Sequence, residues 1–344
     1  MTMAIEFKRE FGTSSFLDPM DNFTQKSLPI EFRYDPLTKD MGIVLEFRSR
    51  LPEKPDLSQL ISKSLQIGCP FCPELVEKVT PKFMPDICPE GRIKVGEATV
   101  FPNPLPYMPY SAITVLSPEH FVGLTGFTPN MLCDAFLASQ SYLKKVHEHD
   151  PEAKYCCVMW NYMPPASSSQ LHPHLQVFAS YSPLAYHQKL LEASQKYRDE
   201  NGASYWSDLI AEEKRLQERY IATIGNTSWL TSFVPRAGLL DVVALFQSRD
   251  AILSLSLKDM DDFSRGLTRV FKYMDDENFY SFNLCLYSGI PEEDAFWTQA
   301  RIIPRVPGPP LAISDVSGLT LLGDATIILR FPELVCQQLK PCFG

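Results

Sequence analysis

The stretch Ser167-Ser-Ser-Gln-Leu-His-Pro-His-Leu-Gln-Val-Phe-Ala-Ser180 decides the interpretation of the fold, and its centre is the run His172-Pro-His-Leu-Gln176. Alternate side chains of an extended strand point to opposite faces, so this pattern predicts His172, His174 and Gln176 on one face. The chain has only six histidines, and two of them stand here beside three serines. The pattern favours a site of polar chemistry; the alternative is a solvated strand face on which the histidines are accidental.

The composition indicates a large globular protein with a small-molecule substrate. The chain has 344 residues and is 45% hydrophobic and 12% aromatic, which allows a large core and two structural units. Its 32 basic and 41 acidic residues give a net charge of −9 without a basic cluster, which argues against nucleic acid or an anionic membrane as partner. The N-terminal residues 1–9 lack the apolar core of a signal peptide and no run is long enough to cross a membrane, so we expect a cytoplasmic protein.

A second signal is the run Gly68-Cys-Pro-Phe-Cys-Pro73. Two thiolates two residues apart can bind one zinc ion or form a redox pair, and the two prolines favour a tight turn and zinc. A redox pair and inert thiols remain the alternatives. The remaining ligands must be histidines or the isolated Cys88, and His120 and His172 can approach the cysteines if the sheet brings these strand ends together.

If His172 binds zinc, His174 is left free for chemistry. A neutral imidazole beside the neutral donors Gln176, Ser168 and Ser169 is suited to covalent nucleotidyl transfer. No glycine-rich phosphate loop of the Walker type is present.

The order of predicted elements repeats along the chain. The first half predicts strands at 98–101, 111–116, 155–161 and over the histidine stretch, with a helix capped by Thr128. The second half predicts strands at 232–235, 241–246, 280–287 and 296–303, with a helix whose apolar face runs from Met260 to Met274. This similarity implies an internal duplication with a charged helical insertion between the copies.

Several segments together resemble the galactose-1-phosphate uridylyltransferase (GalT) family, a branch of the histidine-triad superfamily. They are Arg33-Tyr-Asp-Pro-Leu-Thr38, Cys69-Pro-Phe-Cys72, Phe101-Pro-Asn103, Ser117-Pro-Glu-His120, Asn161 and Ser168-Ser-Gln-Leu-His-Pro-His-Leu-Gln176. The match runs in order from about residue 30 to the C-terminus, and the His-Pro-His-x-Gln motif is specific when the two upstream motifs accompany it.

The resemblance implies an α+β fold of two tandem histidine-triad-like units with antiparallel sheets and packed helices. The second unit is expected to be degenerate, because Gln299-Ala-Arg301 stands where the first has its histidine face. The expected division is an N-terminal extension (1–30), a catalytic unit with the zinc site (31–183), a helical insertion (184–227) and the degenerate unit (228–344).

The resemblance also implies roles for single residues. His174 is the expected nucleophile, Gln176 binds the phosphoryl group, and Ser169 and Ser168 contact the phosphates. The expected ligands of a structural zinc ion are Cys69, Cys72, His120 and His172. The residues expected to hold the nucleotide are Arg33, Asn103 and Asn161, although Arg33 by itself is a surface arginine before an Asp-Pro turn.

The expected reaction moves a nucleoside monophosphate from a nucleotide sugar to a sugar 1-phosphate through nucleotidyl-His174. Inorganic phosphate as acceptor, as in nucleotide-sugar or dinucleotide phosphorylases, is the alternative, since Gly323-Asp-Ala325 replaces the Gly-Tyr-Glu segment that contacts hexose in relatives. A non-catalytic, zinc-stabilised nucleotide-binding protein is an alternative of another class. We expect no second metal site, because residues 297–304 hold no histidine, and a homodimer, because relatives dimerise.

Overall fold

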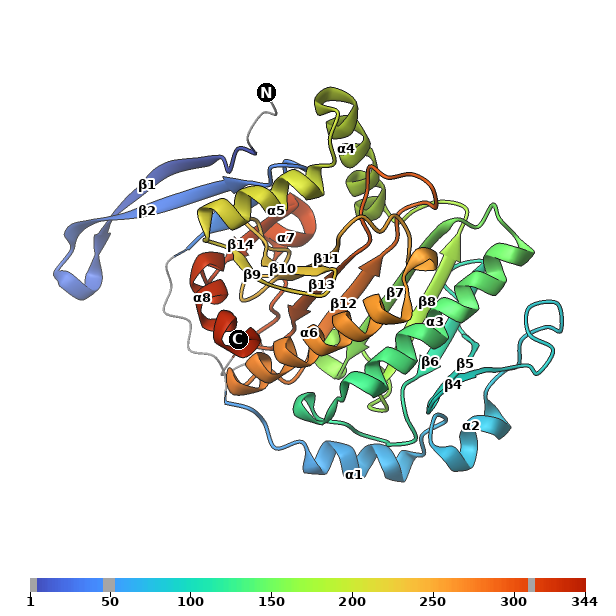
Figure 1. Cartoon of the computed structure of the whole chain (residues 1–344). Helices are drawn as coiled ribbons and strands as arrows, with labels where there is room; N and C mark the ends of the chain where they lie inside the picture. Colours follow the sequence, from blue (N-terminus) through green and yellow to red (C-terminus); the bar gives the residue numbers. More distant parts are fainter. Residues whose placement is uncertain (1–4, 46–52, 309–312) are drawn as a thin grey trace.

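A ten-stranded antiparallel sheet forms the centre of the computed structural model, which describes residues 5–45, 53–308 and 313–344 (Figure 1). The strands lie in the order β4-β5-β6-β8-β7-β12-β13-β11-β10-β9. Their bounds are β4 Ile93–Val95, β5 Ala98–Pro102, β6 Tyr110–Val115, β7 Tyr155–Tyr162, β8 His174–Ser180, β9 Tyr220–Ile224, β10 Thr227–Thr231, β11 Val242–Phe246, β12 Phe282–Tyr287 and β13 Gln299–Pro304. Parts of the predicted units (1–4, 46–52 and 309–312) lie outside the described residues.

The sheet consists of two halves with the same topology. Counted from its outer edge, each half places its strands in the order first, second, third, fifth, fourth, and the two fourth strands, β7 and β12, pair at the centre. One long helix follows the third strand of each half: α3 (Pro129–His149) is capped by Thr128, and α6 (Leu257–Asp276) by a capping box of Ser256 and Asp259. The predicted α+β class with a tandem duplication is confirmed.

The two faces of the sheet are covered differently. Helices α3 and α6 lie on one face, where side chains such as Leu175, Trp160 and Phe282 join one large apolar core (Figure 1). On the opposite face, α4 (Ala185–Asn201) and α5 (Tyr205–Leu216) pack on the second half through a separate apolar cluster. The corresponding face of the first half carries the histidine strand.

A smaller sheet joins the two ends of the chain. Its order is β1 (Arg9–Asp18), β2 (Thr24–Tyr34), β3 (Met41–Val44) and β14 (Ala325–Ile328), and β3 and β14 are parallel. Most of the predicted N-terminal extension is therefore a β-hairpin, which projects from the body (Figure 1). The hairpin exposes the large apolar residues Phe11, Phe16, Leu17, Met20, Phe23 and Leu28.

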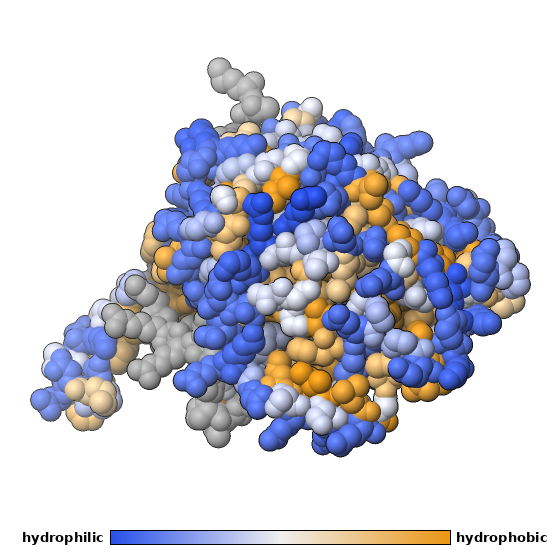
Figure 2. All heavy atoms as spheres, turned by 60° about the horizontal axis from the view of Figure 1, so that its bottom comes forward, coloured by the Kyte–Doolittle hydropathy of each residue, from blue (hydrophilic) through white to orange (hydrophobic). Residues whose placement is uncertain are grey.

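Shorter helices complete the described structure. They are α1 (Ser58–Ile67), α2 (Pro73–Val79), α7 (Gly318–Gly323), α8 (Pro332–Phe343) and the 3₁₀ turns Pro19–Asp21, Leu124–Gly126, Pro164–Ala166 and Ile252–Ser254. The α1 side comes forward in Figure 2, where apolar patches lie among hydrophilic side chains. Within the described ranges, no helix combines the length and the apolar character needed to cross a bilayer.

Two local predictions differ from the structure. The strand predicted at 232–235 is a bend, and the sheet instead contains β10 (Thr227–Thr231) and β9 (Tyr220–Ile224), both of which lie at least partly inside the predicted insertion. Gly225, at φ 54°, provides the left-handed turn that joins them as a hairpin. The histidine strand also begins later than predicted, at His174, because Pro173 has no N–H to donate to the ladder.

A buried ion cluster fastens the chain ends to the second half. The Arg219 side chain is fully buried and pairs with Glu213 at 2.7 Å, Glu218 at 2.6 Å and Glu333 at 2.8 Å. Its guanidinium lies 4.2 Å from the ring centre of Phe7. Arg219 therefore links α5, β9, the N-terminal segment and α8.

Replacing Arg219 by alanine is expected to lower the free energy of unfolding by about 3–5 kcal/mol, because it leaves the buried Glu213 carboxylate without a cation. Arg215→Ala, which removes an exposed pair with Glu212, is the matched control and should cost less than about 1 kcal/mol. Urea unfolding followed by circular dichroism measures both. Equal costs for the two variants would contradict the role of the cluster.

Candidate metal centre and the adjoining histidine

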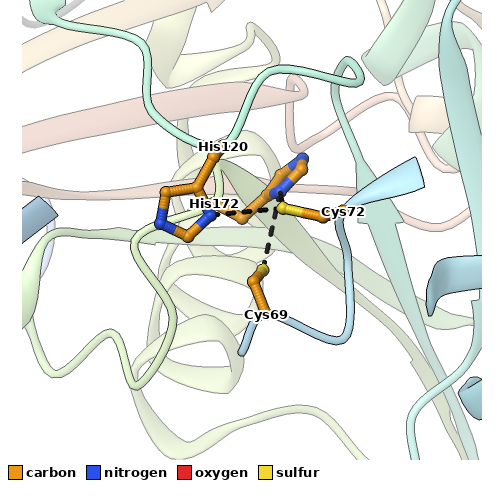
Figure 3. Close-up of side chains that lie close together, drawn as sticks. All are labelled: Cys69, Cys72, His120 and His172. Carbon is orange, nitrogen blue, oxygen red and sulfur yellow. Dashed lines mark hydrogen bonds between the residues drawn. The ribbon is translucent and has the colours of Figure 1, made fainter. Parts of the chain in front are cut away.

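Four side chains from three separate segments meet at one end of the first half (Figure 3). Cys69 and Cys72 lie in the turn between α1 and α2, where the Cys72 N–H donates to the Cys69 carbonyl at 3.3 Å and Pro73 begins α2. His120 follows β6, and His172 lies two residues before the start of β8. The structure thus brings together all four predicted ligands.

Their spacing fits a tetrahedral zinc ion. Usual zinc–sulfur and zinc–nitrogen bonds place a sulfur and a nitrogen ligand about 3.6 Å apart. The observed separations are 3.3 Å from Cys72 Sγ to His120 Nδ1, and 3.7 Å from both Cys69 Sγ and Cys72 Sγ to His172 Nδ1 (Figure 3). All four ligand atoms lie within 4.8 Å of one another, so this group can hold a metal ion such as zinc.

In both histidines, a hydrogen bond from Nε2 determines the tautomer of the imidazole. His172 Nε2–H donates to the Ser117 carbonyl at 2.8 Å, which leaves the Nδ1 lone pair directed at the thiols. Ser64 Oγ donates to the Ile61 carbonyl, so it accepts from His120 Nε2–H at 2.6 Å. Both rings therefore present an unprotonated Nδ1, as metal coordination requires.

The protonation states of the ligands in the metal-free site also determine how the site would bind zinc. Burial lowers the pKa of His172 to about 4, so this ligand is neutral at pH 7. Burial, with a contribution from Cys69, raises the pKa of Cys72 to about 12, so its thiol stays protonated without a metal. Zinc binding must release that proton, and zinc affinity should fall as the pH falls.

The purified protein is expected to contain about one zinc ion per chain, since the four-ligand set is closed. Cys72→Ala should remove most of this zinc and lower the melting temperature by about 10 °C, because structural zinc contributes to folding. Metal analysis and thermal unfolding measure the two effects. Cys342→Ala, a partly buried cysteine in α8, is the control; a reversible Cys69–Cys72 disulfide without zinc would instead support redox chemistry.

His174 lies beside the metal group but does not belong to it. Its Nδ1–H donates to the backbone carbonyl of His172 at 2.9 Å, and the ring centre of Phe71 lies 5.1 Å away. The carbonyl can only accept, so the proton resides on Nδ1 and the Nε2 lone pair is free. Burial lowers the pKa of His174, which keeps the imidazole neutral and nucleophilic at pH 7.

The three residues predicted to contact phosphate differ in how accessible their polar groups are. Gln176 is half-buried on the same strand face as His174, as the alternation predicts. Ser169 is exposed on the loop that precedes β8. Ser168 donates its hydroxyl to the Gln170 carbonyl at 2.7 Å, so it supports the loop and would have to break this bond to donate to a phosphate.

The predicted nucleotide contacts are not gathered in one place. Asn161 lies on β7, and its Oδ1 accepts from Asn283 Nδ2 at 2.7 Å. Asn103 follows β5, and its Oδ1 accepts from the Leu105 N–H at 3.0 Å. Arg33 is buried and pairs with Glu31 at 2.7 Å and with a carboxylate of α8 at 2.9 Å, so its guanidinium is occupied within the protein.

Three neighbours of the site were not predicted from the sequence. Asn283 on β12 contacts Asn161, and Arg305 Nη1 donates to Asn283 Oδ1 at 2.9 Å. Ser64 supports His120 from α1. Ser64 lies 56 residues from His120, and Asn283 lies 122 residues from Asn161. The contact between Arg305 and Asn283 depends on the register of β12 and β13. No local pattern could have identified them.

Comparison with other proteins gives both a family and a fold. No protein-family model matches the chain. An uncharacterized protein of Archaeoglobus fulgidus is 30% identical over 338 residues, which cover 98% of each chain. The chain belongs to the family of this archaeal protein. A GalT-like protein and an ADP-glucose phosphorylase with bound ADP-glucose, both from Arabidopsis thaliana, have TM-scores of 0.69 at 17% and 19% identity.

A uridylyltransferase structure has a TM-score of 0.66 at 16% identity. Each of the three structures aligns with 90% of this chain and with 97% or 98% of its own chain. The chain therefore has the GalT-like fold, and the resemblance drawn from the motifs is confirmed at the level of the fold.

The GalT-like duplication locates the counterpart of His174. His174 pairs with Val115 on the third strand of its half, and Gln299 pairs in the same way with Leu245. Arg301 then replaces Gln176, and its guanidinium lies 3.2 Å from the buried Asp241. The second half is thus degenerate at the position that corresponds to His174. The metal group described above is the single one found among the described residues, and the absence of a second metal site stays a prediction.

Proposed function

We propose that the protein is a nucleotidyltransferase that forms a covalent nucleotidyl intermediate on His174 Nε2. The observation that carries this proposal is the hydrogen bond from His174 Nδ1–H to the His172 carbonyl, which leaves Nε2 unprotonated. The fold agrees with it, since proteins with this fold include a uridylyltransferase and an ADP-glucose phosphorylase.

The first step forms a bond from Nε2 to the α-phosphorus of a nucleotide donor and breaks the bond from phosphorus to the bridging oxygen. The leaving group departs as a phosphate anion with that bonding pair. Gln176, half-buried on the same face, is placed to donate to the phosphoryl oxygens, and Ser169 is the accessible hydroxyl of the loop. The His172 carbonyl stabilises the positive charge that develops on the ring through Nδ1–H.

In the second step an acceptor phosphate oxygen attacks the phosphorus and the pair of the P–N bond returns to Nε2. The acceptor is a sugar 1-phosphate in the transferase reaction and inorganic phosphate in the phosphorylase reaction. The expected roles of Arg33, Asn103 and Asn161 in holding the nucleotide remain predictions, as do the homodimer, the cytoplasmic location and the domain boundaries. The structural role proposed for zinc is to hold His172 in place.

Incubation with UDP-glucose or ADP-glucose labelled in the α-phosphate should place label on the protein in an acid-labile, base-stable linkage typical of phosphohistidine. His174→Ala should abolish this labelling and lower turnover by at least about 10³-fold, because the nucleophile is removed. His149→Ala, an exposed histidine at the end of α3, is the control and should label normally. A His174→Ala variant with unchanged exchange would favour a non-catalytic, nucleotide-binding protein.

Labelling should persist below neutral pH, because burial holds the pKa of His174 below its ordinary 6.5. Between pH 7.5 and 6.5 an ordinary histidine loses nearly half of its neutral form, whereas the neutral fraction of His174 should fall by less than this. Single-turnover labelling rates with UDP-glucose at the two pH values test this, since its diphosphate does not titrate there. A fall of nearly one half in the labelling rate would show that the pKa of His174 is not lowered.

A further inference from the structure

A chain of hydrogen bonds crosses the seam where β7 pairs with β12 and ends beside His174. Asp315 accepts two bonds from Arg305, at 2.7 and 3.0 Å, and Arg305 Nη1 donates to Asn283 Oδ1 at 2.9 Å. Asn283 Nδ2 then donates to Asn161 Oδ1 at 2.7 Å, from β12 to β7. The sequence motifs and the proposed transfer step give no role to the three residues of this chain that belong to the second half.

The groups around Asn283 determine which way each amide points. A guanidinium can only donate, so the Asn283 oxygen must face Arg305. The Ala166 carbonyl can only accept, so the Asn283 nitrogen must face Ala166, at 3.0 Å, and with it Asn161. The group that Asn161 presents to Asn283 is therefore its oxygen, and its own Nδ2 points to the other side of the side chain.

The Ala166 carbonyl is a fixed acceptor because its loop is closed by bonds of its own. The N–H groups of Ala166 and Ser168 donate to the Met163 carbonyl at 3.0 and 3.3 Å. A change at Asn283 leaves this closure intact. The loop thus orients Asn283, and does not need Asn283 for its own shape.

The free nitrogen of Asn161 lies next to the proposed nucleophile. Met159 on β7 pairs with Gln176 on β8, and Asn161 and His174 lie two residues further in the same direction, on the same face. Residues opposite each other on neighbouring antiparallel strands have Cα atoms about 4.5–5.5 Å apart, so a phosphoryl group on His174 is within reach of Asn161. Asn161 is half-buried, and no protein partner of its Nδ2 lies in the described part of the chain.

The corresponding place in the second half has no amide. Gln299 is the counterpart of His174, and its neighbour on β12 is Tyr287. Tyr287 pairs with Cys157 across the seam, so these two residues take the places of the two asparagines. A role in joining the halves would be expected at both places. The amide pair stands at the one beside the histidine, which favours a role in the chemistry of His174.

The orientation of the Asn161 amide matters because the transferred group is an anion. An N–H donor stabilises negative charge on phosphoryl oxygens, whereas an amide oxygen at the same place repels them. We propose that Asn283 and Arg305 are positioning residues for the transfer at His174, which hold the Asn161 amide with Nδ2 toward the phosphoryl oxygens. This inference rests on the proposed function, since it requires a nucleotidyl group on His174.

The first test is Asn283→Asp, which has the shape of asparagine but no proton to donate. The new carboxylate still accepts from Arg305, and the Asn161 amide must turn over to donate to it, so that Oδ1 faces the phosphoryl group. Single-turnover labelling by α-labelled UDP-glucose or ADP-glucose should slow by about 10²-fold, as for the loss of one oxyanion donor. Asn283→Ala, which removes the bond without reversing the amide, should slow it by only about tenfold.

A purely structural role of Asn283 predicts the opposite order, because alanine removes more contacts than aspartate. Thermal unfolding confirms that each variant is folded. Asn226→Asp makes the same change at a half-buried asparagine between β9 and β10, and this control should label normally. An Asn283→Ala variant slower than Asn283→Asp would overturn the inference.

A double-mutant cycle separates the turned amide from the added negative charge. Asn161→Ala alone should slow labelling by about 10²-fold, and adding Asn283→Asp should slow it by less than about threefold more, because no amide is left to turn over. Losses that multiply would show direct repulsion by the carboxylate and would overturn the inference, with the proposed function left intact. Failure of the unaltered protein to label with either donor would instead reject the proposed function.

Arg305 provides a second test that leaves the seam itself unchanged. Arg305→Ala removes the donor to the Asn283 oxygen, and labelling should slow by roughly fivefold in the otherwise unaltered protein but not in Asn161→Ala. The matched control is Arg330→Ala, which breaks a pair with Glu277 at 2.9 Å and should label normally. Equal rates for the Arg305→Ala and Arg330→Ala variants would overturn the role of Arg305.

Discussion

The contacts of His172 connect the metal group to the proposed nucleophile. Its Nδ1 faces both thiols at 3.7 Å, its Nε2–H donates to the Ser117 carbonyl, and its own carbonyl accepts from His174 at 2.9 Å. A rotation of this residue would therefore disturb the metal ligands and the tautomer of the nucleophile together. Through this coupling, a metal ion held by the four ligands would influence the orientation and tautomer of His174 without contacting it.

The alternation of the strand and the proline before it explain why the two histidines differ. Pro173 keeps His172 out of the ladder, where its ring can turn toward the cysteines, and β8 begins with His174 on the open face. Leu175 and Val177 point into the core beneath α3. The same short segment thus anchors the sheet, supplies a metal ligand and positions the buried residue proposed for chemistry.

The sequence allowed the metal group and the duplication to be predicted because both depend on local patterns. Cysteines two residues apart, a histidine after a strand and a repeated order of strands and helices are visible without a structure. The environment of Arg33 was not predictable, because one of its carboxylate partners, Glu333, lies 300 residues away. Strand β9 was also missed, since five residues next to a charged helix give a weak signal and only pairing with β10 stabilises them.

The two halves have diverged in how they use the same sheet face. In the second half, Gln299 and Arg301 replace the histidine and the glutamine, Arg301 pairs with Asp241, and α4 and α5 cover the face with residues such as Trp206. Apolar burial there stabilises the scaffold, while the first half keeps a neutral imidazole whose free nitrogen faces away from the core. The two halves join where β7 pairs with β12. Asn161 and Asn283 are opposite each other in this pair, and their side chains form a hydrogen bond across it. Groups from both halves therefore meet on the face that carries His174, so the second copy contributes side chains beside the first although it has lost the histidine itself.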